Sequence, residues 1–375
     1  MKLLKKLSLY SKFYVLYGFR WLIPLKKTNY LFISMSGNSY GGNPKAFSDY
    51  LQNRIENINL FWAESENLII VDQNVKPLKL YSWRYFYSLL QTQIIVSDQR
   101  LWKPMMPRKR KKQLYVQVWH GTALKKIEAD MPNLELGYQI MAERDSKYID
   151  VFLSGSSFMT QIYQTSFWYD GKMLEIGTPR NDIFFNSNNM GLIQKIKDFY
   201  GINEEKIILY APTFRAEGSL EACHMDTNAI FKSLGGTNKW KVLVRLHPNL
   251  MGSISQNDFS ELYPKTINAS TYPDMQELLC ATDLLITDYS SSMFDFMYTG
   301  KPCILFATDI NTYDRGFYIS IRDLPFPIAE TNEQLINILS SNLHLDYSSF
   351  LYKIGSFENG TASQQLYEYI KKKCL

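Results

Sequence analysis

The chain has 375 residues, of which 46% are hydrophobic and 15% aromatic, and its formal net charge is +5. This length predicts two domains, and the apolar content excludes a disordered chain. The four cysteines show no CxxC spacing, and no histidine, cysteine and carboxylate spacing indicates zinc. We therefore expect no resident metal and no disulfide framework, and a reducing compartment is favoured over export.

The first 27 residues carry seven basic side chains and no acidic one. Apolar residues recur among them at steps of three and four, which predicts a basic amphipathic helix over residues 1–27 on an anionic membrane surface. An ordinary helix packed on the first domain, with solvated lysines, is the alternative. The most apolar run, Phe13–Leu25, is too short and interrupted to span a bilayer, and it has no small-residue cleavage site.

From residue 28 the pattern of strand, loop and helix repeats. Strands are predicted at Asn29–Ser34, Ile58–Trp62, Leu68–Val71, Gln93–Val96, Leu114–Val118, Val151–Ser154 and Met173–Ile176. Helices are predicted from near Pro44 and at Ser82–Gln91, Leu134–Asp145 and Ser156–Thr165. This alternation predicts a parallel sheet with helices on both faces.

The polar stretch Asn186–Met190 separates an expected N-terminal domain, 28–188, from a C-terminal domain, 189–375. The last helix of the second domain could pack back on the first. Further strands are predicted at Ile207–Tyr210, Val242–Leu246, Leu284–Ile286 and Cys303–Phe306, and helices at Thr227–Leu234, Asp274–Cys280, Ser291–Tyr298, Asn332–Ser340 and Ser363–Lys373. No internal repeat is evident. The fold class expected is α/β, with two Rossmann-like domains that face a cleft in a glycosyltransferase-B-like architecture.

Three polar motifs each follow a predicted strand. They are Trp119-His120-Gly121-Thr122, Arg245-Leu246-His247-Pro248, and Thr287-Asp288-Tyr289-Ser290-Ser291-Ser292. In α/β proteins ligands gather at the carboxyl ends of strands, so we expect the three motifs to contribute to one site.

The chemistry of these side chains favours the binding and transfer of phosphate groups. His120 has the intermediate pKa of a general base, although a structural histidine bonded to a carbonyl is the alternative. Arg245 and His247 would present two cations to a phosphate, whereas a buried ion pair with a capping histidine is the alternative. The loop Ser290–Ser292 at a helix start predicts anion binding beyond simple capping, and Asp295 could orient its hydroxyls.

Other motifs carry weaker signals, and ordinary turns are the alternative for each. The loop Gly37–Asn43 is glycine-rich but lacks a nucleotide-binding spacing. Contacts to the acceptor or to phosphate are expected from Gly37, Asn38, Ser39, Tyr40, Asn43, Lys45, Arg180, Asn181, Asp182, Thr213 and Arg215.

In order along residues 30–370, these motifs resemble the CDP-glycerol glycerophosphotransferase family, the teichoic-acid primases and polymerases. The segments that carry the resemblance are Gly37–Tyr40, Asn43–Ala46, Trp119–Thr122, Gly177–Asp182, Tyr210–Arg215, Arg245–Pro248, Thr287–Asp295, Arg315–Tyr318 and Asn359–Ser363. One departure is Ala123, where the family usually has proline. The resemblance implies a glycosyltransferase-B fold, two essential histidines (His120 and His247), and a donor nucleotide in the C-terminal domain.

The expected reaction transfers glycerol phosphate or ribitol phosphate from a CDP-polyol to a hydroxyl of a lipid-linked or polysaccharide acceptor, releasing CMP. His120 is the expected base. The donor is expected to contact Thr213, Arg215, Arg245, His247, Thr287, Asp288, Ser290, Ser291, Ser292 and Asp295; Gly121, Thr122 and Arg315 are expected near the acceptor. No tightly bound cofactor or nucleic acid is expected, and the expected location is the cytoplasmic face of a bacterial membrane. The alternatives are a nucleotide-sugar glycosyltransferase of the same fold and a non-catalytic protein that binds membranes or polyanions.

Overall fold

The computed structural model describes residues 2–66, 68, 70, 72–186, 189–213, 224–246, 256–311, 316–341 and 343–374. The chain divides into two units. Unit 1 comprises Met1–His120, Ile127–Asp182 and Ile354–Leu375, and unit 2 comprises Gly121–Lys126 and Ile183–Lys353. Each unit is built on one sheet, and we describe the two separately.

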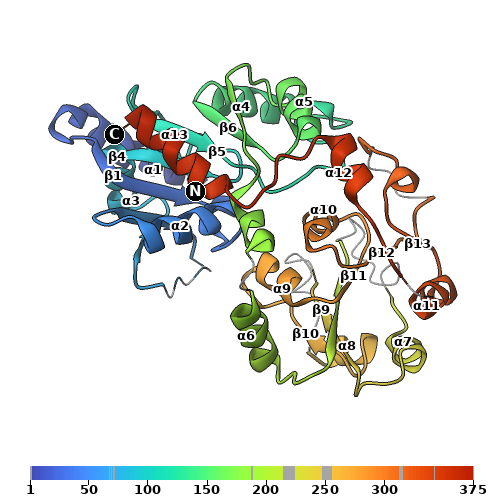
Figure 1. The fold of residues 1–375 in the computed structure, drawn as a ribbon. Helices are drawn as coiled ribbons and strands as arrows, with labels where there is room; N and C mark the ends of the chain where they lie inside the picture. Colours follow the sequence, from blue (N-terminus) through green and yellow to red (C-terminus); the bar gives the residue numbers. More distant parts are fainter. Residues whose placement is uncertain are drawn as a thin grey trace. The chain divides into compact units, whose positions relative to one another are not determined.

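The sheet of unit 1 is entirely parallel, with the strand order β3-β2-β1-β4-β5-β6-β7 (Figure 1). Its strands are β1 Lys26–Ile33, β2 Asn59–Glu64, β3 Val75–Lys79, β4 Thr92–Ser97, β5 Leu114–Gln117, β6 Val151–Ser154 and β7 Lys172–Glu175. The central strands are buried on both faces, which explains their nearly continuous apolar sequences.

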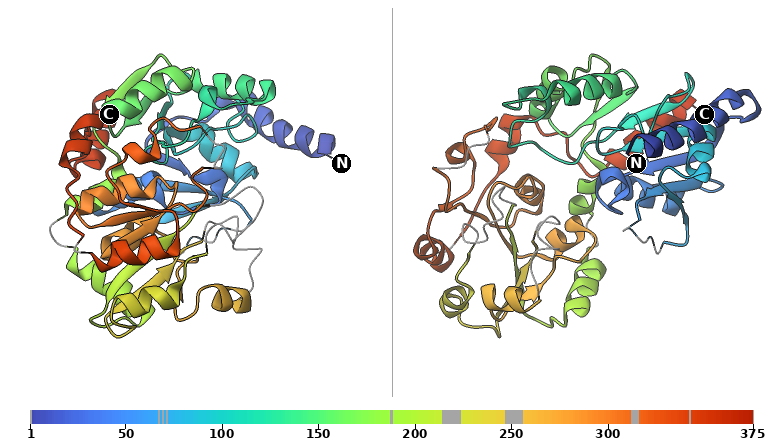
Figure 2. Two further views of the ribbon diagram at one scale, coloured as in Figure 1. Left: turned by 90° about the vertical axis from the view of Figure 1, so that its right-hand side faces the viewer. Right: turned by 180° about the vertical axis from the view of Figure 1, so that it is seen from behind.

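Helices cover both faces of this sheet. They are α1 Lys2–Gly18, α2 Gly42–Arg54, α3 Trp83–Gln91, α4 Leu136–Ser146, α5 Ser157–Ser166 and α13 Ala362–Cys374. On one face α2 and α13 share a core with the strands, through Phe47, Leu51, Leu366 and Ile370. Figure 1 and Figure 2 both show the red C-terminal helix beside the blue N-terminal elements.

Unit 2 repeats this plan with a second parallel sheet, in the order β10-β9-β8-β11-β12-β13. Its strands are β8 Lys206–Ala211, β9 Trp240–Val244, β10 Ile267–Asn268, β11 Leu284–Thr287, β12 Cys303–Phe306 and β13 Ile328–Ala329. The helices are α6 Met190–Tyr200, α7 Thr227–Ser233, α8 Gln256–Leu262, α9 Met275–Ala281, α10 Ser292–Phe296, α11 Asn332–Ser340 and α12 Ser348–Ile354. Short 3-10 turns extend some of these elements.

Counted within each unit, both sheets follow the doubly wound order 3-2-1-4-5-6, and unit 1 adds a seventh strand. The prediction of two Rossmann-like α/β domains is therefore confirmed. In such sheets the strand order reverses between the first and fourth strands, and ligands characteristically bind at that switch point. These switch points lie between β1 and β4 in unit 1, and between β8 and β11 in unit 2.

Two predicted elements need correction. No strand forms at the described positions of the range Leu68–Val71, and the third strand is β3 at Val75–Lys79. Pro77 made that segment look unlike a strand, but proline is tolerated because β3 is an edge strand. The helix expected over residues 1–27 ends at Gly18, because a 3-10 turn and Pro24 lead directly into β1 at Lys26.

Helix α1 is both packed and exposed. Phe13 is fully buried, with its ring 5.6 Å from that of Phe86. Downstream, however, Phe19, Trp21 and Leu22 are 56%, 74% and 61% exposed. No helix in the described part of the chain has both the length and the hydrophobicity needed to cross a membrane.

Candidate functional site

His120 lies just beyond the carboxyl end of β5, and its side chain is accessible to solvent. Its Nδ1 is 2.8 Å from the main-chain oxygen of Asp98, a contact that requires the proton on Nδ1. Nε2 therefore carries the lone pair that a general base needs. Crowding by protein atoms, followed by repulsion from Arg180, lowers the pKa of His120 below its ordinary value, and the Asp98 contact opposes this.

The main chain around His120 is clamped by two of the predicted residues. The Asn43 side-chain amide donates to the carbonyls of Val118 and Trp119, at 2.9 Å each. Arg180 donates from Nη1 to the His120 carbonyl at 2.6 Å, and its own N–H donates to Asn43 Oδ1 at 3.0 Å. Three segments far apart in sequence are thus joined, and Asn43 acts on the loop rather than presenting its amide to a ligand.

Trp119 adds a second constraint on the histidine. It adopts a left-handed conformation, with φ at 44°, and its ring stacks on His120 with centroids 4.2 Å apart. The other side of Trp119 packs edge-on against Phe167. A strained residue that the surroundings hold in place is a common feature of functional loops.

The glycine-rich loop is largely engaged with the protein itself. Gly37 has φ at 79°, and a Cβ there would lie 2.6 Å from Leu80 Cδ1 and 3.0 Å from the Ser65 nitrogen, so glycine is strongly favoured. The other predicted side chains or carbonyls of this loop have partners: Asn38 with Met35 and Ser65, Ser39 with Trp62, Tyr40 with Asp72, and Lys45 with Asp49.

The predicted residues Asn181 and Asp182 anchor the C-terminal segment of unit 1. Asp182 accepts the first N–H groups of α13, from Ala362 and Ser363, at 2.9 and 2.8 Å. Asn181 donates to Glu358 at 3.0 Å. The sequence analysis did not single out Glu358, which also accepts the N–H and hydroxyl of Thr178.

The residues after His120 belong to unit 2. Gly121 and Thr122 begin a segment that pairs with residues 316–318, where the Lys126 N–H donates to Gly316 and the Tyr318 N–H donates to Leu124, both at 2.8 Å. Arg315, predicted near the acceptor, lies outside the described residues.

In unit 2, Thr213 and the motif beginning at Thr287 meet at the switch point. The buried Thr287 hydroxyl donates to the carbonyl of Ala211 at 2.6 Å. Both Asp288 oxygens accept the Thr213 N–H, at 2.9 and 3.1 Å. These two motif residues hold neighbouring strand ends together.

The serine loop leads into α10. Ser291 is the residue before the helix, and its side chain makes no capping bond. Ser290 Oγ instead accepts bonds from the Ser292 hydroxyl and N–H, at 2.9 and 3.3 Å. Asp295, which was expected to orient the serine hydroxyls, accepts a hydrogen bond from the buried Gln276 at 3.0 Å. This contact is with the core of unit 2 and not with the serine loop.

Arg245 follows β9, and its guanidinium donates to the carbonyls of Ala269 and Tyr272. Burial lowers its pKa, though an arginine stays charged. These two partners are carbonyls rather than the carboxylate of the alternative ion pair. His247 and Arg215, both predicted to contact the donor, lie outside the described residues.

Asp98 is the principal residue that the sequence analysis missed. It directly follows β4, is 3% exposed, and accepts the Ser34 hydroxyl at 2.6 Å and the Met35 N–H at 3.1 Å. Burial raises its pKa from 3.8 to about 6. Its signal in the sequence was the apolar run ending in Ser97-Asp98, which parallels the run ending in Thr287-Asp288.

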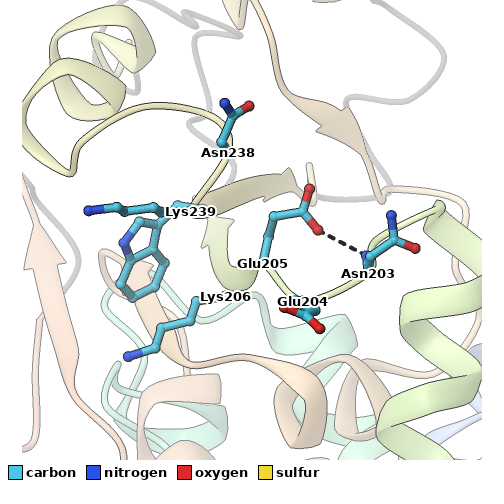
Figure 3. A pocket seen from close by; sticks show the side chains of 7 residues that line it. Asn203, Glu204, Glu205, Lys206, Asn238 and Lys239 are labelled. Atoms are coloured by element: carbon cyan, nitrogen blue, oxygen red, sulfur yellow. Dashed lines mark hydrogen bonds between the residues drawn. The ribbon is translucent and has the colours of Figure 1, made fainter.

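A depression of about 600 Å³ in unit 2 lies away from these motifs, at the amino-terminal ends of β8 and β9 (Figure 3). Its Glu205 accepts the Asn203 N–H at 2.9 Å and pairs with Lys241 at 3.0 Å. None of the predicted site residues lines it. Ligands of doubly wound sheets bind at the opposite, carboxyl edge, so we do not assign this depression to the site.

Comparisons with known proteins confirm the family resemblance. The family model described as CDP-Glycerol:Poly(glycerophosphate) glycerophosphotransferase matches residues 15–372. A teichoic acid poly(glycerol phosphate) polymerase from Staphylococcus epidermidis is 30% identical over 375 residues, covering 93% of this chain and 51% of the relative. The chain thus spans about half the length of that relative. A teichoic acid glycerol-phosphate transferase from Staphylococcus aureus is 31% identical and is matched over 94% of this chain and 96% of its own length.

A solved structure shows the same fold. It is a variant of the wall teichoic acid polymerase TagF soaked with CDPG, and it is 29% identical with a TM-score of 0.83. The match covers 93% of this chain and 90% of that one.

Proposed function

Because the chain belongs to the CDP-glycerol:poly(glycerophosphate) glycerophosphotransferase family, we propose that it transfers a polyol phosphate from a CDP-polyol to an acceptor hydroxyl. The polyol is glycerol or ribitol, the acceptor is a lipid-linked saccharide or a polysaccharide of the cell wall or capsule, and CMP is released. Relatives named for glycerol phosphate and for ribitol phosphate both match, so similarity alone supports either donor.

The observation that carries this proposal is the state of His120. Its Nδ1 proton is committed to the Asp98 carbonyl, and its lowered pKa keeps Nε2 unprotonated at neutral pH. Nε2 would accept the proton of the acceptor hydroxyl as that oxygen bonds to the phosphorus of the polyol phosphate. The bond from this phosphorus to the CMP oxygen breaks, and CMP carries away the electron pair.

Unit 2 supplies the proposed donor site. Thr213, Ser290 and Ser291 lie around its switch point, where N–H groups and hydroxyls suit a diphosphate. The hydrogen bonds of Thr287 and Asp288 fix the strand ends at this switch point, and Arg245 adds a positive charge. Arg215 and His247 remain proposed donor contacts on the strength of the family motif. Structures of the relative TagF include variants at two different histidines, which is consistent with a role for both His120 and His247.

We also propose that the 3-10 turn after α1, residues 19–22, rests on an anionic membrane. Phe19, Trp21 and Leu22 expose apolar surface beside Arg20, the composition that suits a lipid interface. A peripheral location at the cytoplasmic face would bring a lipid-linked acceptor within reach. Phe13 and Phe86 meanwhile attach the helix to unit 1, so anchor and domain would move together.

The decisive experiment incubates the protein with CDP-glycerol, CDP-ribitol or a UDP-sugar and a lipid-linked acceptor, followed by mass spectrometry of the products. We expect CMP release and a mass gain of one or more polyol phosphates. UDP release with sugar transfer would instead identify a glycosyltransferase. Salt-dependent polyanion binding without turnover would identify a non-catalytic protein.

A further inference from the structure

The two units share a local device that the sequence analysis did not anticipate. At each switch point the last residue of the fourth strand carries a hydroxyl, which donates to the last carbonyl of the first strand. In unit 1 this bond joins Ser97 to Ile33 at 2.8 Å, and in unit 2 it joins Thr287 to Ala211 at 2.6 Å.

The next residue extends the correspondence. An aspartate follows the hydroxyl residue in both units and accepts the N–H of the residue two positions beyond the first strand. Asp98 accepts from Met35 at 3.1 Å, and Asp288 accepts from Thr213 at 2.9 Å. Position for position, Asp98 in unit 1 therefore corresponds to Asp288 of the family motif in unit 2.

In unit 1 the aspartate restrains a costly backbone conformation. Met35, Ser36 and Gly37 are three successive left-handed residues, with φ at 43°, 55° and 79°. Two of them carry side chains that disfavour this conformation, so the turn needs compensating bonds. The Asp98 carboxylate supplies them through the Met35 N–H and the hydroxyl of Ser34.

The same residue also faces the histidine. Strand β4 lies between β1 and β5, so Asp98 stands between the turn that follows β1 and the loop that carries His120. Its carboxylate binds the first, and its main-chain carbonyl binds Nδ1 of the second. A shift of Asp98 would move both together.

We propose that Asp98 is a positioning residue of the transfer reaction. It holds the turn Met35–Gly37 and the base His120 in the relative positions that the acceptor requires. This inference rests on the proposed function. It assigns Asp98 to the positioning of the acceptor and the base, and its counterpart Asp288 to the binding of the donor. Substitution of Asp98 should therefore impair use of the acceptor, whereas substitution of Asp288 should impair use of the donor.

The test is steady-state kinetics with each substrate varied in turn. We expect Asp98→Ala to lower kcat/KM for the acceptor by about 100-fold, the scale of a misplacement near 1 Å, while the KM for the CDP-polyol stays within about twofold. Asp98→Asn keeps an oxygen for the Met35 N–H and should recover part of this loss. Asp288→Asn should instead raise the donor KM.

The matched control is Asp150→Asn, since Asp150 accepts the N–H of Tyr115 at the opposite edge of the same sheet, and it should leave both values unchanged. Hydrogen exchange at the Met35 amide gives a readout independent of turnover, and it should accelerate in Asp98→Ala. If that variant fails to fold, Ser34→Ala removes only one bond and should lower acceptor kcat/KM by about tenfold.

Unchanged acceptor kinetics in Asp98→Ala would overturn the proposal, as would equal changes for both substrates or the same loss in Asp150→Asn. Failure of the proposed function looks different, because the unmodified protein would then release no CMP from either CDP-polyol. The positioning role would fall with it.

Discussion

Replacing Asp98 with asparagine should change how stability depends on pH. The carboxyl is almost wholly buried, and burial raises its pKa from 3.8 to about 6. In the unfolded chain the group ionises near its ordinary value, whereas in the folded protein it stays protonated about two pH units longer. As pH rises from well below 4 to well above 6, the folded state therefore loses about 3 kcal/mol relative to the unfolded state.

Asparagine has nearly the same shape but no ionisation, so Asp98→Asn removes this loss. Unfolding free energies of both proteins, measured in urea at pH 4 and pH 7.5, give a difference of differences in which other titrating groups cancel. Asp145, whose buried carboxyl also has a raised pKa, is one such group. Between pH 4 and pH 7.5 the variant should gain about 2.5 kcal/mol of unfolding free energy relative to the wild type. A pH-independent difference, or a ¹³C carboxyl titration of Asp98 centred near 4, would refute the reasoning.

Three further outcomes are expected. His120→Ala should lower turnover by roughly 10²–10⁴-fold while calorimetry shows nearly unchanged CDP-polyol binding, and retained turnover would disprove the base assignment. Replacing Ser290 and Ser291 together with alanine should weaken donor binding by about 1–3 kcal/mol, because backbone donors remain; unchanged affinity would argue against a phosphate contact. Replacing Phe19 and Trp21 together with serine should reduce sedimentation with anionic vesicles without shifting the unfolding midpoint, since both side chains are exposed. Equal sedimentation would count against the anchor.

The elements that could be predicted from sequence are those with long apolar runs. Strands such as β4 and β11 are buried on both faces, so their composition identifies them without knowledge of their neighbours. The two-residue strands β10 and β13 carry too little sequence to show a period. Strand β3 contains Pro77, a residue that argues against a strand in a sequence. Proline is tolerated there because β3 is an edge strand, a position that only the strand order shows.

The site divides in a similar way. The place of His120 just beyond a strand end could be predicted, because a histidine beside glycine after an apolar run is conspicuous within a few residues of sequence, and its role as the base stays a prediction. Asp98 could not, since its bonds to Ser34 and Met35 span more than sixty positions and depend on the pairing of β1 with β4. Asn43 was predicted to contact a ligand, yet its amide is occupied by the main chain around the histidine, a contact that requires the fold.

The shared switch-point device suggests why the two units can take different parts in one reaction. Since the same hydroxyl and aspartate hold the first and fourth strands in both, the difference must lie in the residues that follow. After β4 the chain continues to Arg100, which is buried in an ion pair with Glu128, whereas after β11 it continues into the serine loop. The proposed base, His120, follows the fifth strand of unit 1, and the equivalent strand in unit 2, β12, is followed by Ala307. On a common scaffold, the proposed proton transfer thus belongs to unit 1 and the proposed phosphate binding to unit 2. Substitutions at the strand ends of one unit should therefore leave the function of the other unit intact.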